Sequence, residues 1–174
     1  EKKRPHWANE DKFGPYQNAW ATIQETNVEY FMVRATYNND SIFGGNFSCL
    51  KVQTMSANIT THSVQALMTY KDSSNKTKDI NVTTRAVTWY NYSKANALQN
   101  TRGNGDKADL GVLVFSDKTQ CDIVSTNSED DLELWVPYNL TDNVPDCCNF
   151  LFDFFMPPNK TKLQIYLGKD ACNY

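Results

Sequence analysis

The chain has 174 residues, a formal net charge of −3, 13% aromatic residues, and only 7 Gly and 6 Pro. This length and composition are typical of one globular domain with a single core, so we expect residues 1–174 to form a single domain without low-complexity tracts. The negative charge lacks the basic footprint of a nucleic-acid binder, and we exclude that class.

The first predicted element is a helix over residues 15–26, PYQNAWATIQET. Pro15 suits the first turn of a helix, because its missing N–H would have no partner there. Ala19, Trp20 and Ile23 then follow at helical spacing. We expect this helix to precede the main body of the fold.

Short runs of strand character follow, separated by clusters of Asn, Asp, Ser and Gly. There are eight of them: 28–37, 48–55, 63–70, 83–92, 108–116, 120–125, 132–137 and 162–168. Their short spacing favours antiparallel hairpins over parallel crossovers, and closing such a sheet removes its exposed edges. The sequence therefore predicts an all-β fold, an eight-stranded antiparallel barrel.

A second helix is predicted after the sequence VPDCC at 144–148. Cys148, Leu151 and Phe155 recur at helical spacing, and the prolines at 157–158 end the pattern. The apolar stripe must cover something, and we place it against the outside of the barrel.

Five cysteines give two pairs and one leftover thiol, and their spacing alone does not determine the connectivity. They are Cys49, Cys121, Cys147, Cys148 and Cys172.

The motif Asn-x-Ser/Thr occurs eight times, against about three expected by chance from the composition. The acceptors are Asn39, Asn46, Asn58, Asn75, Asn81, Asn91, Asn139 and Asn159. This excess and the cysteines favour a secreted, extracellular glycoprotein. Because neither a signal peptide nor an apolar run of about 20 residues is present, we expect a mature secreted form that does not span or bind a membrane.

Glu133 and Trp135 share one face of the strand at 132–137, while Leu132 and Leu134 point to the other. If that shared face looks into the barrel, a carboxylate is buried beside an indole, which is costly unless a cation compensates it. Arg34 or a ligand ammonium would be such a cation, because acids and aromatic faces form cages for organic cations. Arg85 is an equivalent internal partner, and a solvated face would need none.

Catalytic patterns are not found. His6 and His62 have no metal-binding spacing, and there is no phosphate loop, G-x-S-x-G or C-x-x-C motif. Asp40 and Asp122 lie near strand ends, where acids are usually turn residues or solvated. We expect a binding protein, not an enzyme, with neither cofactor nor metal.

Seven collinear segments resemble the tick salivary lipocalins, and most closely the tick histamine-binding proteins. They are QNAW (17–20), FMVRATYNND (31–40), NFSCLKV (46–52), YNYSKANA (90–97), FSDKTQCDI (115–123), LELW (132–135) and DNVPDCC (142–148). The resemblance implies a lipocalin barrel with an N-terminal and a C-terminal helix outside it. It also implies disulfides Cys49–Cys172 and Cys121–Cys148, which leave Cys147 free.

The same resemblance implies ligand-binding residues. Tyr37, Asp40, Glu133 and Trp135 match the tighter amine site of the family; Glu25, Tyr30 and Asp122 fall near a second site, and Phe43 stands where the family has Trp. This chain also departs from the family: Val82 or Thr83 replaces a Glu, Leu98 and Asn100 replace an aromatic pair, and Asp109 or Leu110 replaces a Phe. These changes should weaken or reshape an amine site.

The resulting hypothesis is a monomeric secreted lipocalin that sequesters a small amine, histamine or serotonin, and so suppresses host inflammation. Asp40 and Glu133 would be the anionic anchors, with Tyr37 and Trp135 as aromatic walls. The alternatives are a lipocalin that inhibits a host immune protein such as a complement component, and a carrier of a lipid mediator. A glycan on Asn39 would crowd access to the barrel.

Overall fold

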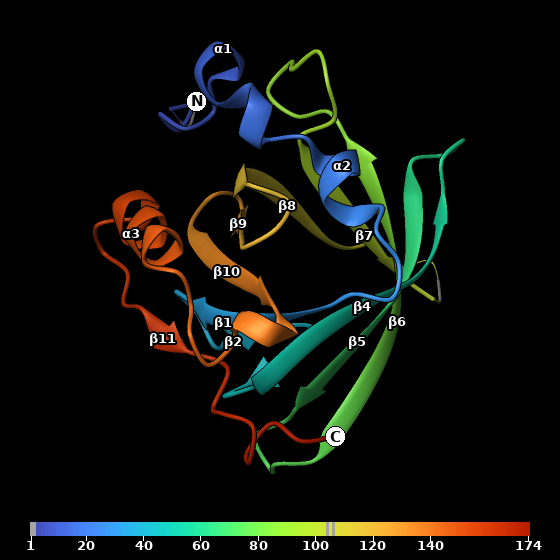
Figure 1. The fold of residues 1–174 in the computed structure, drawn as a ribbon, viewed down its shortest axis with the longest axis vertical. Helices are drawn as coiled ribbons and strands as arrows, with labels where there is room; N and C mark the ends of the chain where they lie inside the picture. Colours follow the sequence, from blue (N-terminus) through green and yellow to red (C-terminus); the bar gives the residue numbers. More distant parts are fainter. Residues whose placement is uncertain (1–2, 104, 106) are drawn as a thin grey trace.

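The computed structural model describes residues 3–103, 105 and 107–174, and within them the centre of the fold is a closed antiparallel barrel (Figure 1). The barrel strands are β1 (Glu29–Ala35), β4 (Ser48–Asn58), β5 (Ser63–Lys71), β6 (Thr77–Val87), β7 (Ala97–Arg102), β8 (Lys107–Ser116), β9 (Asp122–Thr126) and β10 (Asp131–Pro137). Each pairs with the next, and β10 closes the barrel on β1 with Val136 opposite Phe31. The predicted eight-stranded antiparallel barrel is confirmed.

One of the eight predicted strands is wrong. The segment 162–168 contains only the short β11 (Leu163–Gln164), which adds to the edge of β1 outside the barrel circuit. The eighth barrel strand is β7, whose sequence ALQNTR shows no apolar alternation because Asn100 is a polar residue on the inward face. The hydrophobic pattern therefore did not predict β7 as a strand.

The strand predicted over 83–92 is shifted. β6 begins six residues earlier, at Thr77, and ends at Val87. Tyr90 and Asn91 adopt positive φ angles of 55° and 59°, which turn the chain and are incompatible with a continuing strand. The remaining predicted strands agree with the structure within three residues at each end.

The single N-terminal helix predicted over 15–26 is also wrong, because the chain forms three short pieces instead. They are α1 (Glu10–Phe13), the 3₁₀ helix η1 (Gly14–Tyr16) and α2 (Ala19–Ile23). Asn18 caps α2, its side-chain oxygen accepting a hydrogen bond from the Ala21 N–H at 3.0 Å. Gln17 is buried, and its amide donates to the carbonyls of Trp7 and Val114, which separates η1 from α2.

The predicted second helix is confirmed as α3 (Asp146–Phe155), which lies outside the barrel (Figure 1). Phe152 is fully buried in the cluster between α3 and the barrel wall. No helix among the described residues is long and apolar enough to cross a membrane.

Two disulfides join the C-terminal segment and α3 to the barrel, in the pairing that the resemblance implied. Cys49 at the start of β4 is bonded to Cys172 in the C-terminal segment, and Cys121 before β9 is bonded to Cys148 in α3. Cys147 is free and exposed, with its sulfur 4.0 Å from that of Cys148.

The barrel has two distinct ends. At the first, β1 ends and β10 begins, and the segment 37–47 contributes Tyr37, Ile42 and Phe43 to the lumen; we call this the loop end. That segment contains the small hairpin of β2 (Asn39–Asp40) and β3 (Gly44–Gly45). At the second, β1 begins and β9 starts, and α2 contributes to the lumen; we call this the helix end. The 3₁₀ helix η2 (Tyr138–Leu140) follows β10.

Candidate functional site

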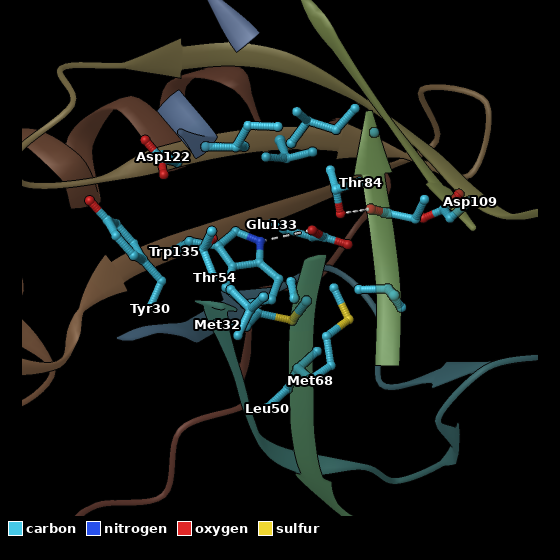
Figure 2. A pocket seen from close by; sticks show the side chains of 18 of the residues that line it. Tyr30, Met32, Leu50, Thr54, Met68, Thr84, Asp109, Asp122, Glu133 and Trp135 are labelled. Atoms are coloured by element: carbon cyan, nitrogen blue, oxygen red, sulfur yellow. Dashed lines mark hydrogen bonds between the residues drawn. The ribbon is translucent and has the colours of Figure 1, made fainter. Parts of the chain in front are cut away.

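A cavity lies inside the barrel and receives side chains from each of the eight barrel strands. Its volume is about 140 Å³, close to the roughly 150 Å³ of an engineered cavity that admits benzene. The wall is mainly apolar, with Met32, Leu50 and Met68 among its members (Figure 2). A compound with one or two rings fits such a space.

Four acids line this cavity, and no Lys, Arg or His of the described residues does. They are Glu25, Asp109, Asp122 and Glu133. Figure 2 shows Asp122 and Tyr30 toward one end of the pocket and Asp109 toward the other, with Glu133 and Trp135 between them. The lumen is therefore suited to a cationic guest, because buried carboxylates need positive partners.

Glu133 and Trp135 face the lumen, and together with Tyr37 they form one hydrogen-bonded unit. The Tyr37 hydroxyl donates to Oε1 of Glu133 at 2.5 Å, and the Trp135 indole N–H donates to Oε2 at 2.9 Å. Burial raises the pKa of Glu133 to about 7, opposed by these two bonds and reinforced by the charges of Asp109 and Asp40. The carboxylate is oriented by neutral donors and not by a cation.

The arginines considered from sequence as partners of Glu133 lie elsewhere. Arg34 donates to the side chain of Asn149 in α3, outside the barrel. Arg85 is exposed to solvent. Among the described residues, no salt bridge includes Glu133.

Asp40, which we expected to be a direct anchor, is not one of the residues that line the cavity. Its Oδ1 accepts hydrogen bonds from the backbone N–H groups of Ile42 and Phe43, at 2.9 and 2.6 Å. The pKa of Asp40 is nevertheless raised, mainly by burial. Asp40 shapes the turn that places Phe43 in the lumen and acts on Glu133 through its charge.

Phe43 belongs to an aromatic cluster at the loop end. Its ring centroid lies 5.1 Å from that of Phe47 and 5.0 Å from that of Tyr70, and its side chain is 8% exposed. It thus occupies the lining position that the resemblance assigned to it, as a smaller ring than Trp.

Asp109 is a lining acid that the ligand set inferred from sequence omitted. The sequence left open whether Asp109 or Leu110 stands where the family has a Phe. Asp109 lines the cavity, while Leu110 packs against the cluster of Phe152 outside the barrel. The two-residue period of β8 indicates this direction. Leu113 packs in the same apolar cluster as Trp135, whereas Val112 packs in the cluster of Phe152 outside the barrel. Counting back in twos from Leu113 reaches Gly111 and Asp109.

The second predicted group lies toward the helix end, where Glu25, Tyr30 and Asp122 all line the cavity. Burial raises the pKa of Asp122 to about 7, against a hydrogen bond with Ser116 and with support from the charge of Asp117. The pKa of the Tyr30 hydroxyl is also raised, first by burial and then by the charges of Asp122 and Glu25. The structure brings this set together.

The departures from the family pattern are resolved in the same way. Val82 lines the cavity, whereas Thr83 points outward and bonds to Gln65. Leu98 and Asn100 both line the cavity. Among the described residues, no group of His, Cys, Asp or Glu is arranged to hold a metal ion.

All eight asparagines of the glycosylation motifs are exposed. Asn39 lies in β2, in the segment that contributes to the loop end. The surface positions are thus sterically open to modification.

The sequence pattern of a family described as tick histamine binding protein matches residues 7–174. The male-specific histamine-binding salivary protein of Rhipicephalus appendiculatus is 32% identical to this chain over 173 residues. That alignment covers 93% of this chain and 84% of the relative.

Two solved structures are similar in fold. AM182 in a complex with serotonin has a TM-score of 0.64 at 15% identity, over 88% of this chain and 91% of that one. Japanin from Rhipicephalus appendiculatus, bound to cholesterol, has a TM-score of 0.63 at 15% identity, over 86% and 97%. At such low identity these likenesses show the fold alone.

Proposed function

Because the chain belongs to the tick histamine-binding protein family, we propose that it is a lipocalin that captures a biogenic amine, histamine or serotonin, inside its barrel. The observation that carries this proposal is the buried Glu133, held between the Tyr37 hydroxyl and the Trp135 indole, with no ion pair to any described residue. An ammonium group would complete it, since hydrogen bonds between charged partners are the strong ones.

The aromatic walls add to the same interaction. Trp135, Phe43 and Tyr37 line the cavity around the Glu133 carboxylate. A cation that lies against such rings gains about 0.5–2 kcal/mol, more when water is excluded. Their packing in a closed barrel leaves little to be ordered on binding, which favours affinity.

The helix end supplies a second, weaker position. Asp122 and Glu25 are its anions, and Tyr30 is its ring. An amine there would meet fewer aromatic faces than at Glu133, so we expect the first equivalent of ligand to bind at the loop end.

The biological setting follows from the same features. The relative named above is a salivary protein by name, and the exposed glycosylation motifs of this chain suit secretion. A secreted amine trap lowers the free amine at the feeding site and so suppresses host inflammation. The protein acts by sequestration and as a monomer, without catalysis.

Isothermal titration with histamine and with serotonin tests the proposal, with Trp135 fluorescence as a second readout. We expect micromolar or tighter binding, indole quenching, and at least tenfold weaker binding for Glu133→Gln. Asp170→Asn is the matched control, because it removes the same charge from an exposed site outside the cavity. Heat-silent titrations of both amines without quenching would refute amine capture.

The two alternatives fit the cavity less well. A sterol or lipid mediator is much larger than a ligand for about 140 Å³ and would meet four acids. Inhibition of a host protein would use the outer surface and would not require carboxylates kept at a cost inside the barrel. A pull-down from host serum, with the glycans removed in parallel, distinguishes this second case.

A further inference from the structure

Asp109 is held in a defined orientation at the wall of the cavity. Its Oδ1 accepts a hydrogen bond from the Leu110 N–H at 2.8 Å, and its Oδ2 accepts one from the Thr126 hydroxyl at 2.7 Å. A carboxylate has about four lone-pair sites, so both oxygens of Asp109 keep the capacity to accept from a ligand.

Asn100 on β7 lies directly opposite Asp109 in the β7–β8 ladder. The Thr84 hydroxyl donates to its Oδ1 at 2.6 Å (Figure 2), which fixes the orientation of the amide. Within the described part of the chain, the amide NH₂ of Asn100 makes no hydrogen bond. The wall beside Asp109 therefore presents both an acceptor and a donor to the cavity.

Among the residues whose side chains the structure describes, no cation forms an ion pair with this acid. In the residues that the structure describes, neither Asp109 nor Glu133 takes part in a salt bridge. Arg102, at the end of β7, acts through its charge on Asp40. Two carboxylates thus face one cavity from different strands, β8 and β10, and repel one another until donors enter between them.

We propose that Asp109 is a specificity-determining residue, which accepts a hydrogen bond from a second donor of the ligand while Glu133 holds its ammonium group. The site then selects two-ended amines, with a ring N–H or O–H remote from the ammonium, over amines without such a group. This inference rests on the proposed amine binding and adds the chemical class of the second contact.

A site built around a buried acceptor rejects analogues that lack the matching donor, because the acceptor is then left desolvated and unpaired. The discrimination should therefore exceed what the loss of one contact from a wet surface would give. We expect at least a tenfold preference for the two-ended member of a matched pair.

Two ligand pairs test this by calorimetry at pH 7.5. Serotonin is paired with the benzothiophene analogue of tryptamine, which keeps the two-ring skeleton but lacks both the ring N–H and the O–H. Histamine is paired with thiophene-ethylamine, which keeps a five-membered ring but lacks the ring N–H. The native protein should prefer serotonin or histamine at least tenfold over its partner. Asp109→Asn and Asp109→Leu should reduce that preference to below threefold by weakening the two-ended amine alone, whereas Asp170→Asn should retain it.

The outcomes separate the two proposals. If none of the four amines binds, the proposed function is lost and this inference with it. If amines bind but the native protein shows no preference within either pair, Asp109 is not a specificity residue, whether or not its variants fold. Equal weakening of both members of a pair by the Asp109 variants would also overturn it, since a general field effect acts on any ammonium.

Discussion

The loop end and the helix end of the lumen each contain a carboxylate with a pKa of about 7, in different surroundings. At the loop end, Glu133 accepts from Tyr37 and Trp135 and feels the charge of Asp109. At the helix end, the raised pKa of Asp122 comes mainly from burial, with one opposing hydrogen bond. The two carboxyl groups thus have a similar pKa, although different hydrogen bonds and neighbouring charges oppose or reinforce the effect of burial.

This difference shows that acidity alone does not identify a binding site. Two hydrogen-bond donors already orient the Glu133 carboxylate, and the charge of Asp109 acts on it. A cation at this place would therefore bind a carboxylate whose orientation is already fixed. Asp122 offers a dry carboxylate with less support. Under the proposed amine binding, we expect a ligand with two donor groups to favour the loop end, and a simple ammonium to distinguish the two ends less.

The largest expected effect concerns the disulfides that anchor the two ends. Cys49–Cys172 ties the C-terminal segment to the loop end across a sequence separation of 123, whereas Cys121–Cys148 ties α3 to the helix end across 27. In the chain-entropy model, replacing each pair by Ala should lower the free energy of unfolding by about 5 and about 3.5 kcal/mol, respectively. Urea unfolding in a Cys147→Ala background measures both, and a larger loss for the shorter loop would contradict the ranking.

The next effect is the pH dependence of stability in the ligand-free protein. Glu133 has an ordinary pKa of 4.5 when unfolded and about 7 when folded, so the folded state holds its proton longer. The contribution of Glu133 to stability should therefore be fully present below pH 4.5 and be lost as the pH rises to about 7, a change of about 3 kcal/mol from this group. Asp122, raised from 3.8 to about 7, contributes a loss of similar size and the same sign.

Glu133→Gln and Asp122→Asn should each remove one part of that pH dependence and stabilise the ligand-free protein at pH 8. Thermal unfolding of the two single variants and the double variant from pH 5 to 8 measures the parts. If the two contributions did not add, the ends would be coupled and the comparison between them would fail.

The barrel was predictable from sequence because most of its strands are short runs separated by clusters of Asn, Asp, Ser and Gly. The two-residue period of a strand placed Glu133 and Trp135 together on one face, and the lumen position of that face follows once the barrel closes. β7 was not predictable in this way, since its inward Asn100 breaks the apolar pattern that marks a strand. A polar residue that faces the lumen thus interrupts the apolar pattern by which its strand would be recognised in the sequence.

The lining of the cavity differs from the predicted ligand set at Asp40 and Asp109, and one cause explains both differences. Asp40 and Asp109 differ in whether the side chain turns to the backbone or to the cavity, which depends on local geometry. Asp40 accepts from two N–H groups of its own turn, as acids near strand ends commonly do. Asp109 lies within β8, where the register with β7 decides its direction.

The smallest expected effect separates the two ends by their tyrosines. Tyr37→Phe removes the hydroxyl that donates to Glu133, which makes that carboxylate harder to ionise and should weaken serotonin binding about fivefold at pH 7, the equivalent of roughly 1 kcal/mol. Tyr30→Phe should change the affinity less than twofold, because its hydroxyl faces Asp122 at the helix end. Calorimetry on both variants makes the comparison.

The pH dependence of this difference identifies its cause. Well above pH 7 the Glu133 carboxylate is ionised with or without the Tyr37 hydroxyl, so the deficit of Tyr37→Phe should shrink by pH 8.5 if it arises from ionisation. The ammonium of serotonin stays protonated across this range and adds no change of its own. A deficit that is larger for Tyr30→Phe would instead place the amine at the helix end, beside Asp122, and would reverse the assignment of the two ends.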